Sequence, residues 1–213
     1  MAEPRGVFVT GTDTNVGKTV ASACLAVAWN AGYWKPIQTG LADDPGDSAT
    51  VTALAGLPPE RVPAPVYALQ APLSPHAAAA AERVTIELEA IARPASRQFL
   101  VVEGAGGILV PLNRSALMID LIGRLGLPAI LVARSALGTI NHTLLSLGAL
   151  RARQVPVAGV VMNGPPDAGN RRAIEQFGRV RVLAELPRVE PLDAAAIRSL
   201  AARIPPLNEV FPS

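Results

Sequence analysis

Short apolar runs alternate along the chain with longer segments in which apolar and polar residues mix. The apolar runs predict strands at residues 7–10, 33–37, 98–103, 129–133, 157–162 and 180–183. The segments between them predict helices at residues 18–30, 47–56, 85–93, 117–125, 141–153, 168–177 and 192–203. Residues 58–75 contain six prolines and are expected to be irregular.

Several of the predicted strands are apolar throughout, without alternation of apolar and polar positions. Residues 99–102, 130–132 and 157–161 are examples. Such strands are typical of a parallel sheet that helices cover on both faces. The alternation of strands and helices predicts the same architecture, an α/β protein with a single doubly wound, mostly parallel sheet in one domain of residues 1–213. Ligands of such folds bind outside the carboxyl ends of the strands, so the chemistry is expected there.

The composition narrows the class of function. The 213 residues carry a net charge of +2, which gives no argument for a nucleic-acid or membrane partner. No apolar stretch reaches the ~18 residues of a membrane span. The one cysteine, Cys24, excludes a disulfide framework and a cysteine-built metal site, and a cytoplasmic protein is expected. Of the 19 basic residues only two are lysines, Lys18 and Lys35, and both fall in motif-like segments.

The strongest motif is GTDTNVGKT at residues 11–19, between the first predicted strand and the first predicted helix. A glycine-rich loop in this position turns backbone N–H groups toward an anion at a helix N-terminus. Lys18 would reach the β and γ phosphates of a nucleotide, and the Thr19 hydroxyl would bind Mg²⁺. Five residues rather than four separate Gly11 from Gly17, so the match to the strict phosphate-loop pattern is imperfect. The alternative is an ordinary turn, but the context favours a phosphate loop and a fold of the P-loop NTPase type.

A second motif, KPIQTG at residues 35–40, ends the second predicted strand. A lysine at that strand end points into the ligand crevice, where a cation would stabilise charge that develops during group transfer. Thr39 supplies a small hydroxyl, and Gly40 lets a ligand approach the backbone. The alternative for Lys35 is a surface lysine with no chemical role.

A third motif, VEGAGG at residues 102–107, places Glu103 at the end of an apolar strand. A carboxylate there is typical of the Mg²⁺ site of phosphate-loop proteins, although Asp is more usual. Mg²⁺ prefers oxygen ligands and keeps several waters, so one or two carboxylates with Thr19 suffice. Asp47 is the candidate second carboxylate, but it also fits the N-cap of the helix predicted at residues 47–56. The alternative for Glu103 is a solvated side chain at a turn.

Two further segments follow later strands. Residues 138–142, GTINH, open a predicted helix whose N-terminal N–H groups can hold a carboxylate. His142 in that segment is interpreted as a cap or a packing residue rather than a base. Asn163 ends a predicted strand and is followed by Gly164, so its amide either hydrogen-bonds a nucleotide base or belongs to a plain turn.

The four motifs GTDTNVGKT, KPIQTG, VEGAGG and GTINHT, in this order and spacing, resemble those of dethiobiotin synthetases. These enzymes are ATP-dependent carboxylases that close the ureido ring in biotin biosynthesis, starting from 7,8-diaminopelargonate and CO₂. The resemblance covers residues 7–163 and continues more loosely to Val189. It implies ATP as co-substrate, Mg²⁺ as cofactor and a homodimer. Gly164 departs from the family, whose members often carry an acidic residue after the base-reading Asn.

The resemblance also implies a role for each matching residue. The catalytic residues of this chain would be Lys35, which would lie beside a carbamate, together with Lys18 and Thr14. Its Mg²⁺ ligands would be Thr19, Asp47 and Glu103. Its nucleotide site would comprise Asn15, Val16, Gly17, Lys18, Thr19, Asp47, Glu103, Gly104, Ala105, Gly106, Asn163, Pro187, Arg188 and Val189. Its diamine site would comprise Thr39, Gly106, Thr139, Ile140 and Asn141, the last three reaching across the dimer.

Two other classes of protein carry a similar nucleotide loop. Switch-type ATPases, which position a protein partner, usually have a further lysine early in the loop, where this chain has Asp13 and Thr14. They also often end in a basic amphipathic helix, a pattern that residues 205–213 do not match. Amidotransferase-type synthetases need a glutaminase domain, for which 213 residues leave no room. The sequence therefore favours a ring-closing carboxylase, with the switch-type ATPase as the alternative.

Overall fold

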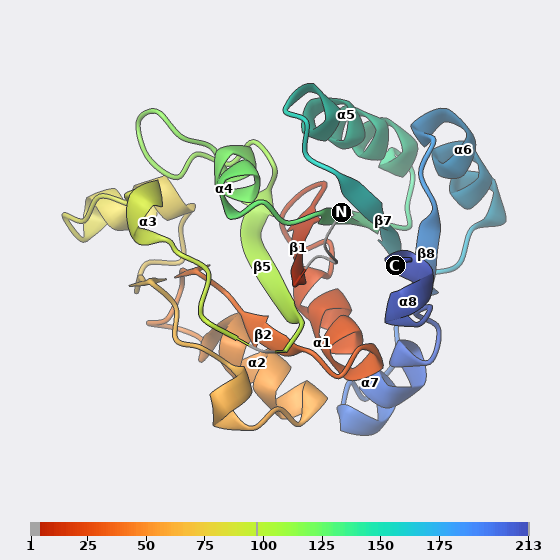
Figure 1. The fold of residues 1–213 in the computed structure, drawn as a ribbon, viewed down its shortest axis with the longest axis horizontal. Helices are drawn as coiled ribbons and strands as arrows, with labels where there is room; N and C mark the ends of the chain where they lie inside the picture. The colour runs from red at the N-terminus through yellow and green to blue at the C-terminus, as the bar shows by residue number, and fades with distance from the viewer. Residues whose placement is uncertain (1–4, 97, 213) are drawn as a thin grey trace.

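The computed structural model describes residues 5–96 and 98–212. Its centre is a six-stranded sheet in the order β2-β5-β1-β6-β7-β8, and every pair of neighbouring strands is parallel (Figure 1). The strands of the structure are β1 (Gly6–Gly11), β2 (Gly32–Trp34), β3 (Ile37–Gln38), β4 (Tyr67–Ala68), β5 (Leu100–Gly107), β6 (Ala129–Arg134), β7 (Val157–Asn163) and β8 (Val182–Leu186). Of these, β3 and β4 lie outside the six-stranded sheet. The α-helices are α1 (Lys18–Ala28), α2 (Gly46–Ala55), α3 (Pro75–Ala81), α4 (Met118–Leu125), α5 (Thr139–Ala152), α6 (Ala168–Gly178), α7 (Ala194–Ala201) and α8 (Leu207–Val210).

Helices cover both faces of the sheet. Helices α1, α2 and α7 pack on one face, and α3, α4, α5 and α6 pack on the other (Figure 1). The expected α/β class with a doubly wound parallel sheet is therefore confirmed. Because the strands are parallel, the segments that follow β1, β2 and β5 leave the sheet at the same edge.

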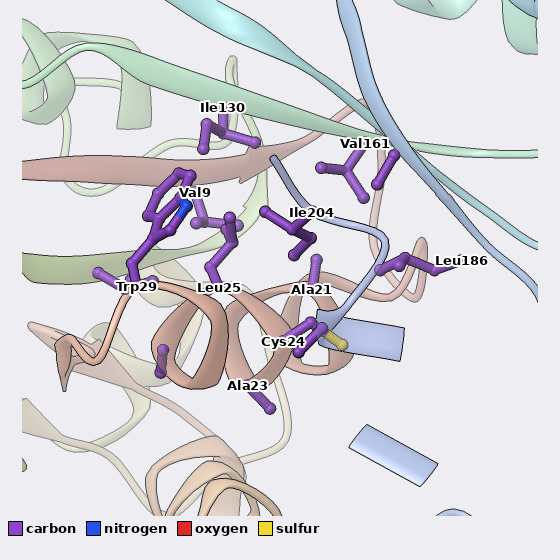
Figure 2. Close-up of a cluster of buried hydrophobic side chains, with 14 of the residues drawn as sticks. Val9, Ala21, Ala23, Cys24, Leu25, Trp29, Ile130, Val161, Leu186 and Ile204 are labelled. Atoms are coloured by element: carbon purple, nitrogen blue, oxygen red, sulfur yellow. The ribbon is translucent and has the colours of Figure 1, made fainter. Parts of the chain in front are cut away.

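Helix α1 packs on the sheet through small side chains. Ala21, Cys24 and Leu25 are fully buried, in the same cluster as Val9 of β1 and Ile130 of β6 (Figure 2). The alanines let the helix approach the sheet closely, which fixes the start of α1 next to the strand ends. The buried helix predicted around Cys24 is confirmed, and burial raises the pKa of its thiol to about 12.

The strand expected at residues 33–37 is broken in two. β2 ends at Trp34 and β3 begins at Ile37, because Pro36 has no N–H group with which to continue the sheet. β3 leaves the main sheet and pairs in parallel with β4. The proline-rich segment 58–75 is therefore not irregular throughout, since β4 lies within it.

The prediction of a helix at residues 85–93 is wrong. The segment is irregular apart from the 3₁₀ turn Leu88–Ala90, and both Ile86 and Ile91 are buried. Two positions five residues apart lie on different sides of an α-helix, so an irregular chain buries both more easily.

Helices α3 and α8 are not among the expected elements. α3 begins at Pro75 with Ser74 in the N-cap position, and a serine followed by proline before a run of alanines is a helix start signal. The remaining elements shift by a few residues, and β5 continues to Gly107 through the glycines of VEGAGG. No helix in the two described ranges combines the length and the apolar character needed to span a bilayer.

Candidate functional site

Residues 12–17 join β1 directly to α1, as expected for a phosphate loop. Two of them have left-handed backbone conformations, Asn15 at φ 56° and Gly17 at φ 94°. Left-handed residues within a loop direct neighbouring N–H groups to one side, and the N-terminus of α1 adds a partial positive charge. The loop therefore has the features of an anion-binding site.

Asn163, at the end of β7, supports this loop. Its Nδ2 atom donates a hydrogen bond to the carbonyl oxygen of Val16 at 3.1 Å. A Cβ atom on Gly17 would lie 2.0 Å from the same Nδ2 atom, so a side chain at that position collides with the support. Neither interpretation of Asn163 from the sequence predicts this contact.

Lys18 is the first residue of α1 and is 8 % exposed. Its Nζ atom donates to the carbonyl oxygen of Asp13 at 3.0 Å, across the loop. Burial, and then the positive charge of Lys35, lower the pKa of Lys18. Two ammonium groups thus share one small site, and an anion bound at the loop would relieve their repulsion.

Lys35 lies at the centre of a buried cluster of charged side chains. Its Nζ atom is 2.7 Å from Asp47 Oδ2 and 3.2 Å from Glu103 Oε1. The same ammonium donates to the carbonyl oxygen of Gly104 at 3.2 Å. Thr19 Oγ1 donates to Asp47 Oδ1 at 2.6 Å and lies 3.3 Å from Glu103 Oε1. Four side chains that the sequence singles out separately are therefore brought together, and Lys35 is not a surface lysine.

The charges of the cluster stabilise one another. Burial alone would lower the pKa of Lys35, but the carboxylates of Glu103 and Asp47 outweigh it and raise that pKa above its ordinary value. Burial alone would raise the pKa of Asp47, but the ammonium of Lys35 outweighs it and lowers that pKa. Lys35 is consequently a fixed cation at neutral pH rather than a base.

Asp47 does not cap helix α2. The helix begins one residue earlier, at Gly46, and Asp47 lies in its first turn. The backbone N–H of Asp47 donates to Gln38 Oε1 at 3.1 Å, while its carboxylate turns to Lys35 and Thr19. The cap interpretation is therefore wrong, and the side chain belongs to the charged cluster.

Two residues of the cluster, Tyr33 and Gln38, were not predicted from the sequence. Tyr33 on β2 is fully buried, and its hydroxyl donates to Glu103 Oε2 at 3.1 Å. Burial and the charge of Glu103 raise the pKa of Tyr33 well above its ordinary value, so the hydroxyl remains a donor. Gln38 holds the backbone of Asp47, and its Nε2 donates to the Thr39 carbonyl oxygen at 2.9 Å. The available signals were the position of Tyr33 on the strand before KPIQTG and the polar Gln38 within that motif.

The charged cluster and the phosphate loop line one cavity of about 400 Å³. A neighbouring cavity of about 500 Å³ lies between the loop and the segment Pro72–Pro75. Their sizes are typical of ligand pockets. The predicted site residues that line the first cavity are Thr14, Asn15, Gly17, Lys18, Thr19, Lys35, Thr39, Asp47, Glu103, Ala105 and Gly106.

Other predicted site residues lie outside these two cavities. Thr139, Ile140 and Asn141 form the first turn of α5, after β6, and line neither cavity. The segment 187–189 follows β8, at the same edge of the sheet as the loop. His142, one residue further along α5, is exposed.

The oxygen atoms of the charged cluster fit a hard divalent cation. Thr19 Oγ1 lies within hydrogen-bonding distance of both Asp47 Oδ1 and Glu103 Oε1. Hydroxyl and carboxylate oxygens are ligands that Mg²⁺ prefers, and Mg²⁺ in nucleotide sites takes its other ligands from phosphates and waters. Across residues 5–96 and 98–212, no three or more His, Cys, Asp and Glu side chains gather at one point.

Comparison with known proteins shows which proteins this chain is similar to. A family model described as an AAA domain matches residues 5–196. The chain is 56 % identical over 202 residues to the ATP-dependent dethiobiotin synthetase of Paramagnetospirillum magneticum, covering 95 % of this chain and 96 % of that protein. It is 49 % identical over 193 residues to that of Rhodopseudomonas palustris, covering 91 % of each. It is also 60 % identical over 211 residues to a bifunctional biotin-biosynthesis protein of Bordetella avium, covering 99 % of this chain but 45 % of that longer protein.

Solved structures share the fold at low identity. The MinC:MinD cell-division complex of Aquifex aeolicus gives a TM-score of 0.55 at 13 % identity, covering 93 % of this chain and 94 % of that one. A ParA-family ATPase of Chlorobium tepidum gives 0.53 at 14 % identity, covering 100 % and 94 %. These likenesses concern the fold alone. The much higher identity to the synthetases extends over nearly the whole chain, and we conclude that the chain belongs to the ATP-dependent dethiobiotin synthetase family.

Proposed function

We propose that this protein, as one domain of residues 1–213, carboxylates 7,8-diaminopelargonate with CO₂ and closes it to dethiobiotin, converting ATP to ADP and phosphate. The observation that carries the proposal is the buried Lys35 between Asp47 and Glu103, in the cavity that contains the phosphate loop. A second fixed cation beside the loop is suited to phosphoryl transfer onto an anionic acceptor. The names of the relatives support the same reaction.

The proposed reaction has three steps. One amine of the diamine adds to CO₂, so that an N–C bond forms, a proton leaves the amine and a carbamate results. A carbamate oxygen then attacks the γ phosphorus of ATP while the bond to ADP breaks, which gives a carbamic–phosphoric anhydride. The second amine attacks the carbonyl carbon, loses its proton and expels phosphate as the ring closes. Positioning and charge neutralisation, rather than a nucleophilic side chain, are what these steps require.

The lysines would supply that charge neutralisation. Lys35, held as a cation by its two carboxylates, would lie beside the carbamate and the phosphoryl group in transfer. Lys18 would leave the Asp13 carbonyl oxygen and contact the β and γ phosphates. Thr14, which lines the same cavity, would be the third catalytic residue. The oxygens of Thr19, Asp47 and Glu103 would hold Mg²⁺; when bound, it supplies positive charge next to the β and γ phosphates.

The remaining nucleotide contacts would come from the loop and from two strand ends. The phosphates would lie between residues 15–19 and residues 103–106. Asn163 would contact adenine through its amide, whose Nδ2 already donates one hydrogen bond to Val16 and whose oxygen accepts no hydrogen bond from the described residues. The segment 187–189 would line the base pocket beside it.

The diamine would occupy the region that the two cavities share and would extend to a second subunit. Thr39 and Gly106 line both cavities and would contact the amines. The first turn of α5, formed by Thr139, Ile140 and Asn141, lines neither, so it would bind the substrate carboxylate of the other protomer in a homodimer. Its N–H groups suit a carboxylate, and Thr139 Oγ1 is buried without a hydrogen-bond partner among the described residues. ATP as co-substrate fits a reaction in the cytoplasm.

Phosphate release tests this proposal. Release from ATP and Mg²⁺ should require both 7,8-diaminopelargonate and bicarbonate as the source of CO₂. Release that is indifferent to the diamine would contradict the proposal and favour a switch-type ATPase.

A further inference from the structure

Glu103 presents its two carboxylate oxygens to different partners. Oε1 faces Thr19 Oγ1 at 3.3 Å and Lys35 Nζ at 3.2 Å, both of which line the cavity. Oε2 accepts a hydrogen bond from the hydroxyl of Tyr33 at 3.1 Å, and within the described residues it has no other partner. Tyr33 itself is 0 % exposed and lines neither of the two cavities described above. The hydroxyl of Tyr33 therefore reaches the site through Glu103.

The pairing of the strands explains why a tyrosine reaches this carboxylate. β2 and β5 are parallel, with Tyr33 opposite Val101. Glu103 follows Val101 by two residues, so both project from the same face of the sheet as Tyr33. Two residues of strand span about 6.6 Å, a distance that a tyrosine side chain bridges with its hydroxyl. A phenylalanine ring would fill the same space and stop short of the carboxylate.

Without the hydroxyl, Oε2 would be a buried acceptor with no partner. Such a group costs free energy, and rotation of the carboxylate relieves it. The strongest donor within reach is the Lys35 ammonium, which already lies 3.2 Å from Oε1. Rotation toward Lys35 would withdraw Oε1 from Thr19 and thus from the oxygens that fit Mg²⁺.

We infer that Tyr33 is a positioning residue that fixes the carboxylate plane of Glu103 and thereby sets the affinity of the nucleotide complex for Mg²⁺. The inference rests on the metal site of the proposed function but not on the identity of the diamine. Partners that orient a metal-binding carboxylate typically change metal affinity by about 10- to 100-fold when they are removed. Tyr33→Phe removes one oxygen atom and keeps the ring in its buried cluster.

The test measures ADP binding by calorimetry over a series of Mg²⁺ concentrations, and again with excess EDTA. Tyr33→Phe should raise the half-saturating Mg²⁺ concentration about tenfold, with ADP affinity in EDTA unchanged within twofold. Trp34→Phe is the matched control. Trp34 is the next residue of β2 and donates from Nε1 to the Ala64 carbonyl oxygen, away from the carboxylates. The Trp34→Phe variant should have a lower melting temperature but the same dependence of ADP binding on Mg²⁺ as the wild-type protein.

A second variant separates donation from packing. Tyr33→4-aminophenylalanine keeps a donor at the ring tip and should restore the wild-type Mg²⁺ dependence. An unchanged Mg²⁺ dependence in Tyr33→Phe, or an equal shift in Trp34→Phe, would overturn the inference. Failure of the wild-type protein to make dethiobiotin while these shifts persist would instead contradict only the proposed function.

Discussion

Replacing Lys35 by alanine removes the one ammonium that contacts both carboxylates of the charged cluster. It deletes the contacts at 2.7 Å to Asp47 and 3.2 Å to Glu103, together with the hydrogen bond to the Gly104 carbonyl oxygen. The phosphate loop and the Lys18 contact to Asp13 involve other atoms. We therefore expect Lys35→Ala to separate catalysis from nucleotide binding.

The magnitudes follow from burial and from the position of the charge. Loss of one preorganised donor to a developing negative charge costs about 10²- to 10³-fold in kcat. Breaking a buried ion pair by removing one partner destabilises a protein by about 3–5 kcal/mol, and we expect about 3 kcal/mol because Asp47 is partly solvated. Glu103 is 1 % exposed and carries most of this cost. ATP affinity should change much less than kcat, because the loop, Lys18 and Thr19 remain in place.

Turnover with saturating diamine, bicarbonate and ATP gives kcat, calorimetry gives ATP affinity, and urea unfolding gives stability. Arg153→Ala is the matched control, because Arg153 forms an exposed ion pair with Asp120 far from the cluster. Such a pair contributes about 0–1 kcal/mol, and its loss should leave kcat unchanged. Near-normal kcat in Lys35→Ala would refute the role of Lys35. A parallel loss of ATP binding would show that Lys35 serves binding and not the chemical step.

Three further predictions concern the metal, acid stability and the loop. Glu103→Gln should raise the Mg²⁺ concentration needed for half-maximal activity, and an unchanged Mg²⁺ titration would count against a metal role. The pKa of Asp47 is lowered below 3.8 in the folded protein, so its contribution to stability is complete above pH 3.8 and is lost as the pH falls through the lower folded value. Asp47→Asn should therefore flatten the acid limb of a stability–pH profile measured by urea unfolding, and an unaltered limb would exclude this contribution. Gly17→Ala would place a Cβ atom 2.0 Å from Asn163 Nδ2 at φ 94°, and should weaken ATP binding measured by calorimetry. Gly123→Ala is its control, because a Cβ atom there would meet nothing within 4 Å apart from its chain neighbours and the backbone of its own helix. Equal ATP affinity in both variants would contradict the steric argument.

The sequence predicts the site better than it predicts the chain around it. The phosphate loop and Lys35 each follow an apolar strand, and Glu103 lies within the apolar strand β5. Parallel strands bring their carboxyl ends to one edge of the sheet, so these residues are expected to be close together. Asp47 is ambiguous in sequence because an aspartate near a helix start suits both a cap and a ligand. The hydrogen bond from Gln38 to the backbone of Asp47 decides between them, and it depends on the path of the loop after β3.

The failures have physical causes that single-sequence patterns do not carry. The contact between Tyr33 and Glu103 depends on the register of β2 against β5, which no local pattern encodes. The pairing of β3 outside the main sheet depends on β4, which lies about 30 residues further along the chain. The segment 85–93 has helix-like composition, yet tertiary burial of Ile86 and Ile91 overrides that preference.

The most direct test of the central claim is incubation of the protein with ATP, Mg²⁺, 7,8-diaminopelargonate and ¹³C-labelled bicarbonate, followed by mass spectrometry. We expect dethiobiotin that carries the label in its ring carbonyl, formed in equal amount to the phosphate released. The Lys35→Ala variant, folded and still binding ATP, should form little of this product. Phosphate release without labelled dethiobiotin would refute the proposed reaction.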